Sequence, residues 1–208
     1  MDSVHDDRVA GGRSAVAEAR VRTGRDLLPL KILVAGGFGV GKTTLVGALS
    51  EVPPLSTEQQ MTSLSTGVDD ATVVPEKTTT TVAMDFGRVT IDDALVLYLF
   101  GTPGQSRFWF MWDELARGAV GAVVLVDLRR VDDCYPAIDY FESRRLPFVI
   151  GVNTFPGSDE FDEATVRDAL ALAADQPLMW FDARDPSSSQ AALVLLVEHA
   201  LARAVVPS

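Results

Sequence analysis

The sequence has little of what would mark a secreted or membrane protein. Cys134 is the only cysteine in 208 residues, so no disulfide can form within the chain. No apolar run approaches the roughly 20 residues that span a bilayer, and the longest, Gly118–Val126, is better interpreted as a buried strand. The N-terminus lacks the apolar core of a secretory signal, and the C-terminus lacks a lipidation signal. We therefore expect a cytoplasmic protein with no direct membrane anchor.

Positive charge is also scarce. The chain has 18 Lys and Arg residues against 29 Asp and Glu residues, which gives a formal net charge of -11. Binding to a phosphate backbone requires clustered Lys and Arg that displace counterions. We therefore expect no nucleic-acid partner.

The length and composition are those of one globular domain. Hydrophobic residues make up 47% of the chain and charged residues 23%, which is ordinary for a soluble fold. Residues 1–28 are small, polar and charged without a clear period, which predicts a flexible N-terminal tail. The folded domain is expected over residues 29–208.

From Leu30 onward, strands alternate with helices. The apolar run "LKILVA" stops at glycines and is followed by "TTLVGALS", which has helical spacing. Residues 51–80 are rich in Pro, Ser, Thr and Asp and are expected to form a long loop. "VAMDFGRVTI" and "ALVLYLF" predict an antiparallel hairpin that turns at Asp92-Asp93. The rest predicts the strands "GAVVLV", "PFVIGVN" and "LMWF" and the helices "DDCYPAIDYFESRR", "EATVRDALALAAD" and "SSQAALVLLVEHALARA".

This alternation predicts an α/β fold with three layers. Right-handed crossovers give a mostly parallel sheet of about six strands with helices on both faces. Such sheets bind ligands at the carboxyl ends of their strands. The motifs described next all fall at such ends.

The clearest motif is a phosphate loop. Gly36-x-x-x-x-Gly41-Lys42-Thr43 lies between a predicted strand and a predicted helix, as its mechanism requires. Glycines let successive N–H groups point inward at phosphate, and the helix N-terminus adds positive potential. Lys42 is expected to reach the outer phosphates and Thr43 to ligate Mg²⁺. The expected nucleotide-binding residues here are Gly36, Gly37, Phe38, Gly39, Val40, Gly41, Lys42, Thr43 and Thr44.

With this loop, the threonine-ended long loop and "GTPGQ" in that order, the chain resembles the Ras-like small GTPases, which have a P-loop NTPase fold. "VAGGFGVGKTT", "KTTTTVAMDFG" and "LVLYLFGTPGQSRFWFMW" are most similar to the CvnD-type nucleotide-binding proteins of actinobacterial conservons, in the MglA-like branch. The resemblance implies a Mg²⁺-dependent GTP/GDP switch with slow, partner-stimulated hydrolysis. It also implies two partners, a roadblock-type (MglB-like) protein and a sensor kinase-like membrane protein, which would recruit the chain to the inner face of the membrane.

The resemblance assigns roles to the switch residues one at a time. Thr81 fits the pattern Thr-x-x-x-Asp-Phe of the threonine that ligates Mg²⁺ and senses the last phosphate, and Thr80 is the alternative. Gly104 would give its N–H to the terminal phosphate. Gln105 would orient the attacking water. The expected catalytic residues are thus Gln105, Lys42 and Thr81, and the expected metal ligands are Thr43 and Thr81.

Two departures from the family pattern put hydrolysis in question. Gly101 stands where small GTPases have an Asp that supports Mg²⁺, and Thr80 stands where some bacterial relatives have an arginine finger. Arg107, Arg88 or a partner would then have to supply the arginine. Asp127, after the strand "GAVVLV", is a second candidate for the carboxylate, although it fits a cap for the following helix better. The alternative function is a pseudo-GTPase that binds nucleotide as a scaffold.

Base recognition departs from the pattern as well. Guanine is normally selected by Asn-Lys-x-Asp, because the Asp carboxylate accepts from the ring N–H and the amino group. Asn153 is retained, but Thr154 replaces the Lys and Pro156 replaces the Asp. In "FDARD", Asp182 and the backbone N–H of Ala183 are expected to contact the base. The preference for guanine is implied by the resemblance and not by these residues, so ATP is the alternative ligand.

Aromatic residues follow the "GTPGQ" motif directly. Helical spacing predicts that Phe108 and Trp112 face the core. Trp109 would then point elsewhere, and either core packing or a partner contact would suit it. An exposed tryptophan on a moving element is a good anchor for a partner, so Arg107 and Trp109 are the candidate partner-binding residues.

Overall fold

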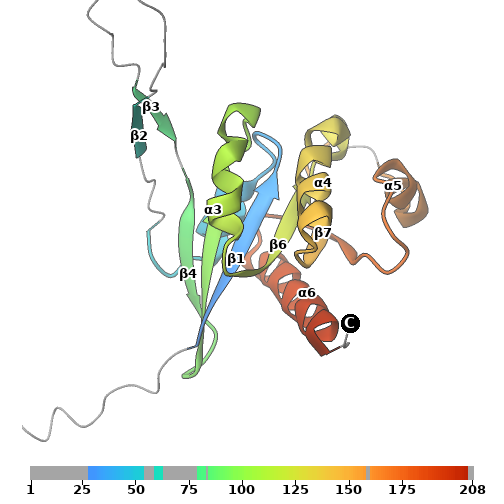
Figure 1. Cartoon of the computed structure of the whole chain (residues 1–208). Coiled ribbons are helices and arrows are strands. Elements are labelled where there is room, and N and C mark those ends of the chain that lie inside the picture. The colour runs from blue at the N-terminus through green and yellow to red at the C-terminus, as the bar shows by residue number, and fades with distance from the viewer. Residues whose placement is uncertain (1–27, 54–58, 63–78, 83, 158–159, 206–208) are drawn as a thin grey trace, which may run out of the picture.

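The computed structural model describes residues 28–53, 59–62, 79–82, 84–157 and 160–205 (Figure 1). The predicted flexible tail therefore lies outside the described residues except for Leu28, and so does most of the predicted loop over residues 51–80. Within the described residues, no helix is long and apolar enough to cross a membrane.

A six-stranded sheet forms the centre of the domain. Its strands, in order across the sheet, are β4 (Phe86–Thr90), β5 (Leu95–Gly101), β1 (Leu28–Gly36), β6 (Ala119–Val126), β7 (Phe148–Asn153) and β8 (Leu178–Phe181). Every neighbouring pair is parallel except β4–β5, which is antiparallel. The sheet confirms the predicted α/β class and the predicted hairpin about Asp92-Asp93.

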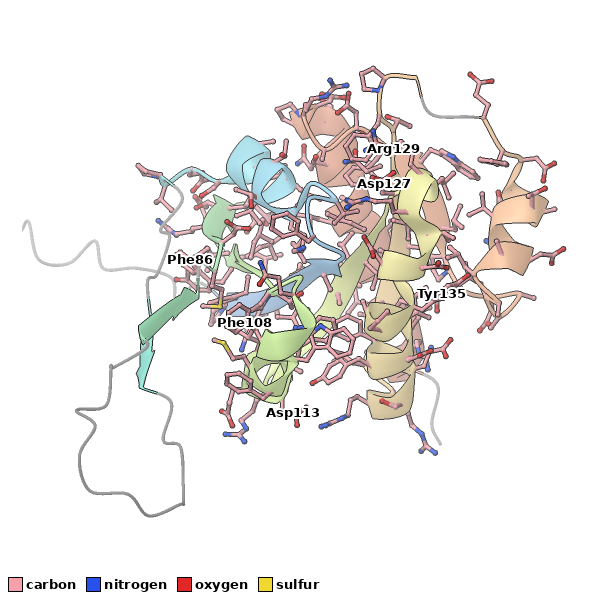
Figure 2. The ribbon with its side chains drawn as sticks, turned by 90° about the horizontal axis from the view of Figure 1, so that it is seen from above. Phe86, Phe108, Asp113, Asp127, Arg129 and Tyr135 are labelled. Carbon is pink, nitrogen blue, oxygen red and sulfur yellow. The ribbon has the colours of Figure 1, made fainter. Side chains whose placement is uncertain are left out.

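Helices cover both faces of the sheet, as predicted. In Figure 2, α2 (Lys42–Leu49) and α6 (Pro186–Val205) lie on one side of the strands, and α3 (Trp112–Ala116) and α4 (Tyr135–Arg144) lie on the other. The short helix α5 (Glu163–Ala169) precedes β8. Two 3₁₀ segments, η1 (Ser106–Met111) and η2 (Leu128–Asp133), follow the carboxyl ends of β5 and β6.

The core consists of one buried cluster on each face of the sheet. Along β1, Leu33 and Ala35 join the cluster beneath α4, while Ile32 and Val34 join the cluster beneath α2 and α6. A strand buried on both faces is apolar at every position rather than at alternate ones. This burial explains why the predicted strands read as continuous hydrophobic runs.

The structure corrects the predicted loop over residues 51–80. β2 (Gln59–Thr62) lies inside that range and pairs antiparallel with β3 (Thr79–Val82), which begins at its end, and the two strands form a separate sheet. Figure 1 shows this pair beyond the edge strand β4. The sequence signal was present, because β-branched threonines favour extended backbone.

The predicted helix over residues 163–175 is also too long. Helix α5 ends at Ala169, and Ala171 adopts the left-handed conformation at φ 50°. Leu172 N–H then donates to the carbonyl of Arg167, and Ala171 N–H donates to that of Asp168. This pattern ends helices most often at glycine, so an alanine there gives no signal in the sequence.

Candidate nucleotide-binding site

The phosphate loop connects the carboxyl end of β1 to the N-terminus of α2. Gly36, Gly39 and Gly41 have φ values of 129°, 74° and 109°, which residues with a side chain rarely adopt. Space is also tight, because a Cβ on Gly36 would lie 2.5 Å from the carbonyl oxygen of Leu125. The loop therefore requires glycine at these positions for its backbone path.

Lys42 is directed into the concave side of this loop. Its Nζ donates to the carbonyls of Gly36 at 2.9 Å and Gly37 at 2.6 Å, and the residue is only 9% exposed. Burial lowers the pKa of Lys42 to about 8, against the opposing effect of the nearby Asp85 carboxylate. An ammonium has three donors, so the two loop carbonyls leave one N–H for a phosphate oxygen.

Asn153 ties the phosphate loop to the loop after β8. Its Nδ2 donates to the carbonyl of Val40 at 3.0 Å, and its Oδ1 accepts from Ala183 N–H at 3.0 Å. The side chain is buried, and a Cβ on Gly41 would come within 2.6 Å of it. The Ala183 N–H that was expected to face the base therefore donates to Asn153 here.

Asp182 lies beside Ala183 and is paired with an arginine. Its carboxylate accepts from the guanidinium of Arg184 at 2.7 Å and from the Arg184 backbone N–H at 2.9 Å. The hydrogen bonds from Arg184 lower the pKa of Asp182 to about 2. Asp182 thus stays charged and holds the turn that carries Ala183.

Arg130 braces the outer side of the phosphate loop, and the sequence analysis missed it. Its Nη2 donates to the carbonyl of Phe38 at 2.7 Å. Its guanidinium also faces Asp133 at 3.6 Å and Asp127 at 3.8 Å. The two residues of the main contact are 92 positions apart, and no local pattern signals such a pair.

The "GTPGQ" motif lies against the phosphate loop. A Cβ on Gly104 would lie 2.8 Å from Lys42 Nζ and 3.0 Å from the backbone of Gly37, so a side chain here would push against the phosphate loop. Gln105 follows with an exposed side chain. The structure thus brings Gly104 close to Lys42, and the contact of Gly104 N–H with a terminal phosphate stays a prediction.

The other expected switch residues are placed only by their backbone. Thr81 lies in β3 opposite Gln60, and Thr80 lies opposite Met61; their side chains are outside the described residues. Arg107 lies in η1, and its side chain is likewise not described. The roles of Thr81 in metal binding and of Arg107 as a finger or partner contact stay predictions.

Asp85 is the acidic side chain that contacts the predicted metal ligand. The Oγ1 of Thr43 donates to Asp85 Oδ2 at 2.7 Å. Asp85 sits just before β4, and its carbonyl accepts from Gly101 N–H at 2.9 Å. A Cβ on Gly101 would lie 2.9 Å from that same Oδ2. In the sequence, Asp85 is the aspartate of the Thr-x-x-x-Asp-Phe pattern that begins at Thr81.

Asp127, the other candidate carboxylate, is engaged elsewhere. It is buried, and it accepts from the backbone N–H of Arg129 at 3.0 Å and from its Nη2 at 2.8 Å, a pair visible in Figure 2. The hydrogen bonds from the Arg129 guanidinium keep the pKa of Asp127 below its usual range. Asp127 therefore caps η2, as the preferred interpretation predicted, and Arg129 stacks on Phe155 at 3.9 Å.

Phe108 and Trp112 face the core, as the spacing predicted, and the two aromatic residues between them, Trp109 and Phe110, lie at the surface. Phe108 and Trp112 are buried, and the Nε1 of Trp112 donates to the carbonyl of Pro103 at 3.2 Å. Trp109 is 40% exposed and Phe110 is 59% exposed. The fixed Trp112 thus anchors η1, while Trp109 is presented at the surface.

The residues at this site fit a magnesium ion bound together with nucleotide. Mg²⁺ prefers oxygen ligands and is usually held by one or two carboxylates, substrate phosphates and water. The Thr43 hydroxyl and the Asp85 carboxylate meet at the mouth of the loop. Among the described residues there is no cluster of three His, Cys, Asp or Glu side chains that would make an all-protein metal site.

Solved structures share this fold. The cytosolic domain of the T. maritima FeoB iron transporter matches at a TM-score of 0.60 in a GDP form, over 84% of this chain, and 0.58 in the apo form, over 83%; each is 16% identical. This chain covers 64% of those two chains, less than two thirds of their length. The isolated G domain of the same transporter matches at a TM-score of 0.55 and 18% identity, over 85% of this chain and 99% of that one.

Sequence comparison gives the family. The uncharacterized protein MJ1339 of Methanocaldococcus jannaschii is 32% identical over 126 residues, which are 60% of this chain and 69% of the relative. The family described as "Conserved hypothetical ATP binding protein" matches residues 34–203, from Val34 in β1 to Arg203 in α6. The phosphate loop lies inside that match, and the chain belongs to this family of nucleotide-binding P-loop proteins.

Proposed function

We propose that the protein is a Mg²⁺-dependent GTP-binding switch that hydrolyses GTP slowly and is stimulated by a partner. The observation that carries the proposal is the close approach of Gly104 to Lys42 and Gly37, which leaves little room for a side chain at position 104. A loop that lies on the phosphate-binding lysine must change its position or contacts according to whether a terminal phosphate is present. We propose further that it works as the CvnD-type, MglA-like switches do, on the strength of the motifs that resemble theirs.

Each residue of the site has a defined task in this proposal. The loop N–H groups and Lys42 bind the phosphates, and Gly104 N–H reaches the terminal one. Gln105 holds the attacking water in line with the bond that breaks. Mg²⁺, held in part by Thr43 and by the expected ligand Thr81, would neutralise the charge that develops on the phosphate oxygens.

Substitution of Gln105 tests this proposal. Gln105→Ala is expected to lower Mg²⁺-dependent phosphate release by about 10²- to 10³-fold, the usual effect of removing one group that stabilises the transition state. Nucleotide affinity should stay within about twofold of the wild type. Gln190→Ala, at an exposed glutamine on α6, is the matched control. An unchanged rate in Gln105→Ala would refute the role of Gln105.

A second candidate is a module that holds nucleotide without hydrolysing it, or that prefers ATP. Two departures favour it, since Gly101 and Thr80 remove charges that normally support the metal and the transition state. The family description names ATP, and Pro156 replaces the carboxylate that selects guanine. Chromatography of the nucleotide released from purified protein would identify the base. Multiple turnovers, alone or with a partner, would exclude a module that only holds nucleotide.

We further propose that a roadblock-type (MglB-like) protein binds at η1, where Trp109 is exposed. Its docking would stimulate hydrolysis and, through a sensor kinase-like membrane protein, recruit this cytoplasmic chain to the inner face of the membrane. Stimulation of phosphate release by such a protein, lost in Trp109→Ala, would support the proposal. Equal stimulation of wild type and Trp109→Ala would place the contact elsewhere.

A further inference from the structure

We infer that Asp127 is a positioning residue of the nucleotide site, which links the phosphate loop to the base segment through two consecutive arginines, Arg129 and Arg130. The base segment is residues 154–156, which directly follow Asn153 at the end of β7. The inference rests on the proposed binding of nucleotide at this site and deepens it. It states how the two ends of the site depend on each other.

Arg130 sets the direction of one peptide group in the phosphate loop. Its Nη2 donates to the carbonyl of Phe38 at 2.7 Å. The C=O and N–H of a trans peptide point in opposite directions, so the N–H of Gly39, in the same peptide group, points away from Arg130. A guanidinium at the carbonyl also polarises the peptide, which makes that N–H a stronger donor. Arg130 therefore orients the Gly39 N–H toward a phosphate oxygen.

Arg129 holds the base segment. Its guanidinium carbon lies 3.9 Å from the centre of the Phe155 ring, which is a cation–π distance. The same segment is bound to β8, because the N–H and the hydroxyl of Thr154 both donate to the carbonyl of Phe181, at 2.9 Å and 3.1 Å. Arg129 thus fixes the aromatic side chain of a segment whose backbone β8 already holds.

One buried carboxylate is shared by the two arginines. Asp127 is 3% exposed. Its Oδ1 accepts from Arg129 Nε at 2.9 Å, and its Oδ2 accepts from Arg129 Nη2 at 2.8 Å, as Figure 2 shows from above. The same Oδ2 lies 3.8 Å from Arg130 Nε. Arg130 has non-helical backbone angles within η2, φ -146° and ψ 58°, so the two consecutive side chains reach different loops.

Because the carboxylate is shared, the contacts of Arg130 depend on Arg129. A buried charge that loses its partner is strongly destabilising. Without Arg129, the guanidinium of Arg130 needs to move by only about 1 Å to hydrogen-bond Asp127, and this movement draws it away from Phe38. Asp133 also faces Arg130 at 3.6 Å, but its side chain is 48% exposed and is solvated. Arg129 therefore preserves the contact with Phe38 by occupying Asp127.

Inorganic pyrophosphate tests this dependence, because it binds a phosphate loop and has no base. Its affinity and that of GDP are measured by calorimetry in the presence of Mg²⁺. Arg130→Gln should lower the affinity for pyrophosphate by about tenfold, the effect of losing a hydrogen bond from a charged group. Arg129→Gln should lower it by about three- to tenfold, although Arg129 has no printed contact with the phosphate loop among the described residues. The loss for GDP in Arg129→Gln should be about two- to fivefold larger, because the base segment also loses its cation–π contact.

Arg144→Gln is the matched control. Arg144 pairs with Asp113 at 2.6 Å and lies over the ring of Tyr140 at 5.3 Å, so it makes the same two kinds of contact as Arg129. Figure 2 shows Asp113 well away from Asp127. Arg144→Gln should therefore leave the affinities for pyrophosphate and GDP within about twofold of the wild type.

Combined variants separate a linked network from independent contacts. In an Arg130→Gln background, Arg129→Gln should not lower the affinity for pyrophosphate further. Asp127→Asn combined with Arg129→Gln removes the charge that draws Arg130 away from Phe38. This pair should bring the affinity for pyrophosphate back to within about threefold of the wild type, and such a recovery excludes a folding defect as the cause of the loss in Arg129→Gln.

Two results would overturn the inference. One is an affinity of Arg129→Gln for pyrophosphate within about twofold of the wild type, and the other is an equal loss from Arg129→Gln with and without Arg130. The proposed function fails separately. Wild type that binds ADP but not GDP would refute a GTP switch and leave the inference standing, with the same ratios measured for ADP, whereas wild type that binds neither nucleotide would refute both.

Discussion

Nucleotide binding should take up a proton near pH 8, because of the environment of Lys42. Burial holds the pKa of its ammonium at about 8 in the free protein. With that value, about one tenth of the molecules have a neutral Lys42 at pH 7, about half at pH 8 and about nine tenths at pH 9. Bound phosphates raise the pKa of an adjacent ammonium. Lys42 is therefore protonated in the complex even at a pH where a fraction of the free molecules has a neutral Lys42.

The sign of the pH dependence follows from this difference. The complex binds more protons than the free protein, so affinity falls as the pH rises through the pKa of the free protein. The loss is about twofold at pH 8 and about tenfold at pH 9, relative to affinity at low pH. It continues until the pH reaches the pKa of Lys42 in the complex.

Calorimetry in two buffers of different ionisation enthalpy measures the uptake directly. At pH 8 the apparent binding enthalpies should differ by about half of the difference between the buffers. In Lys42→Arg the guanidinium stays charged at these pH values, so residue 42 should take up no proton when nucleotide binds. Equal enthalpies in both buffers for the wild type, with flat affinity from pH 7 to 9, would refute the argument from burial.

Substitutions of Asn153 and of two tryptophans test the hydrogen bonds of the phosphate loop and the packing of the segment after "GTPGQ". Asn153→Ala leaves the Val40 carbonyl and the Ala183 N–H without their partner, so we expect a loss of about 1–3 kcal/mol in the free energy of unfolding. Chemical denaturation measures this loss, and unchanged stability would contradict the prediction. Trp112→Ala should cost about 3–5 kcal/mol in the same assay, because the side chain is buried. Trp109→Ala should leave stability within about 0.5 kcal/mol while weakening partner binding; a large fall in melting temperature would show a core role instead.

Local patterns predicted the fold well where strands and turns are strongly marked. The strand Leu178–Phe181 was predicted with its observed ends, and the hairpin about Asp92-Asp93 was found. The phosphate loop was also visible, because its glycines and lysine must occur at fixed spacing. These features depend on neighbours in the chain, so the sequence displays them directly.

Contacts between distant segments were not visible. The hydrogen bond between Thr43 and Asp85 joins residues 42 positions apart. It forms only because the register of β4 against β5 places Asp85 at the end of the sheet near Thr43. The signal for it was nonetheless present, because counting back along both strands from the Asp92-Asp93 turn places Asp85 opposite residue 100 or 101. The brace from Arg130 had no such signal, since it depends on the kinked backbone of η2.

Hydrogen bonds from side chains hold the backbone of the phosphate loop in place without any ligand. The loop carbonyls that accept side-chain hydrogen bonds are those of Gly36, Gly37, Phe38 and Val40, and the donors are Lys42, Arg130 and Asn153. Ordering a backbone residue costs about 1–2 kcal/mol, and here folding itself has already ordered the loop. A nucleotide therefore meets a preorganised receptor, so its association rate should be set by diffusion and by the movement of the "GTPGQ" segment rather than by closure of the loop around the phosphates.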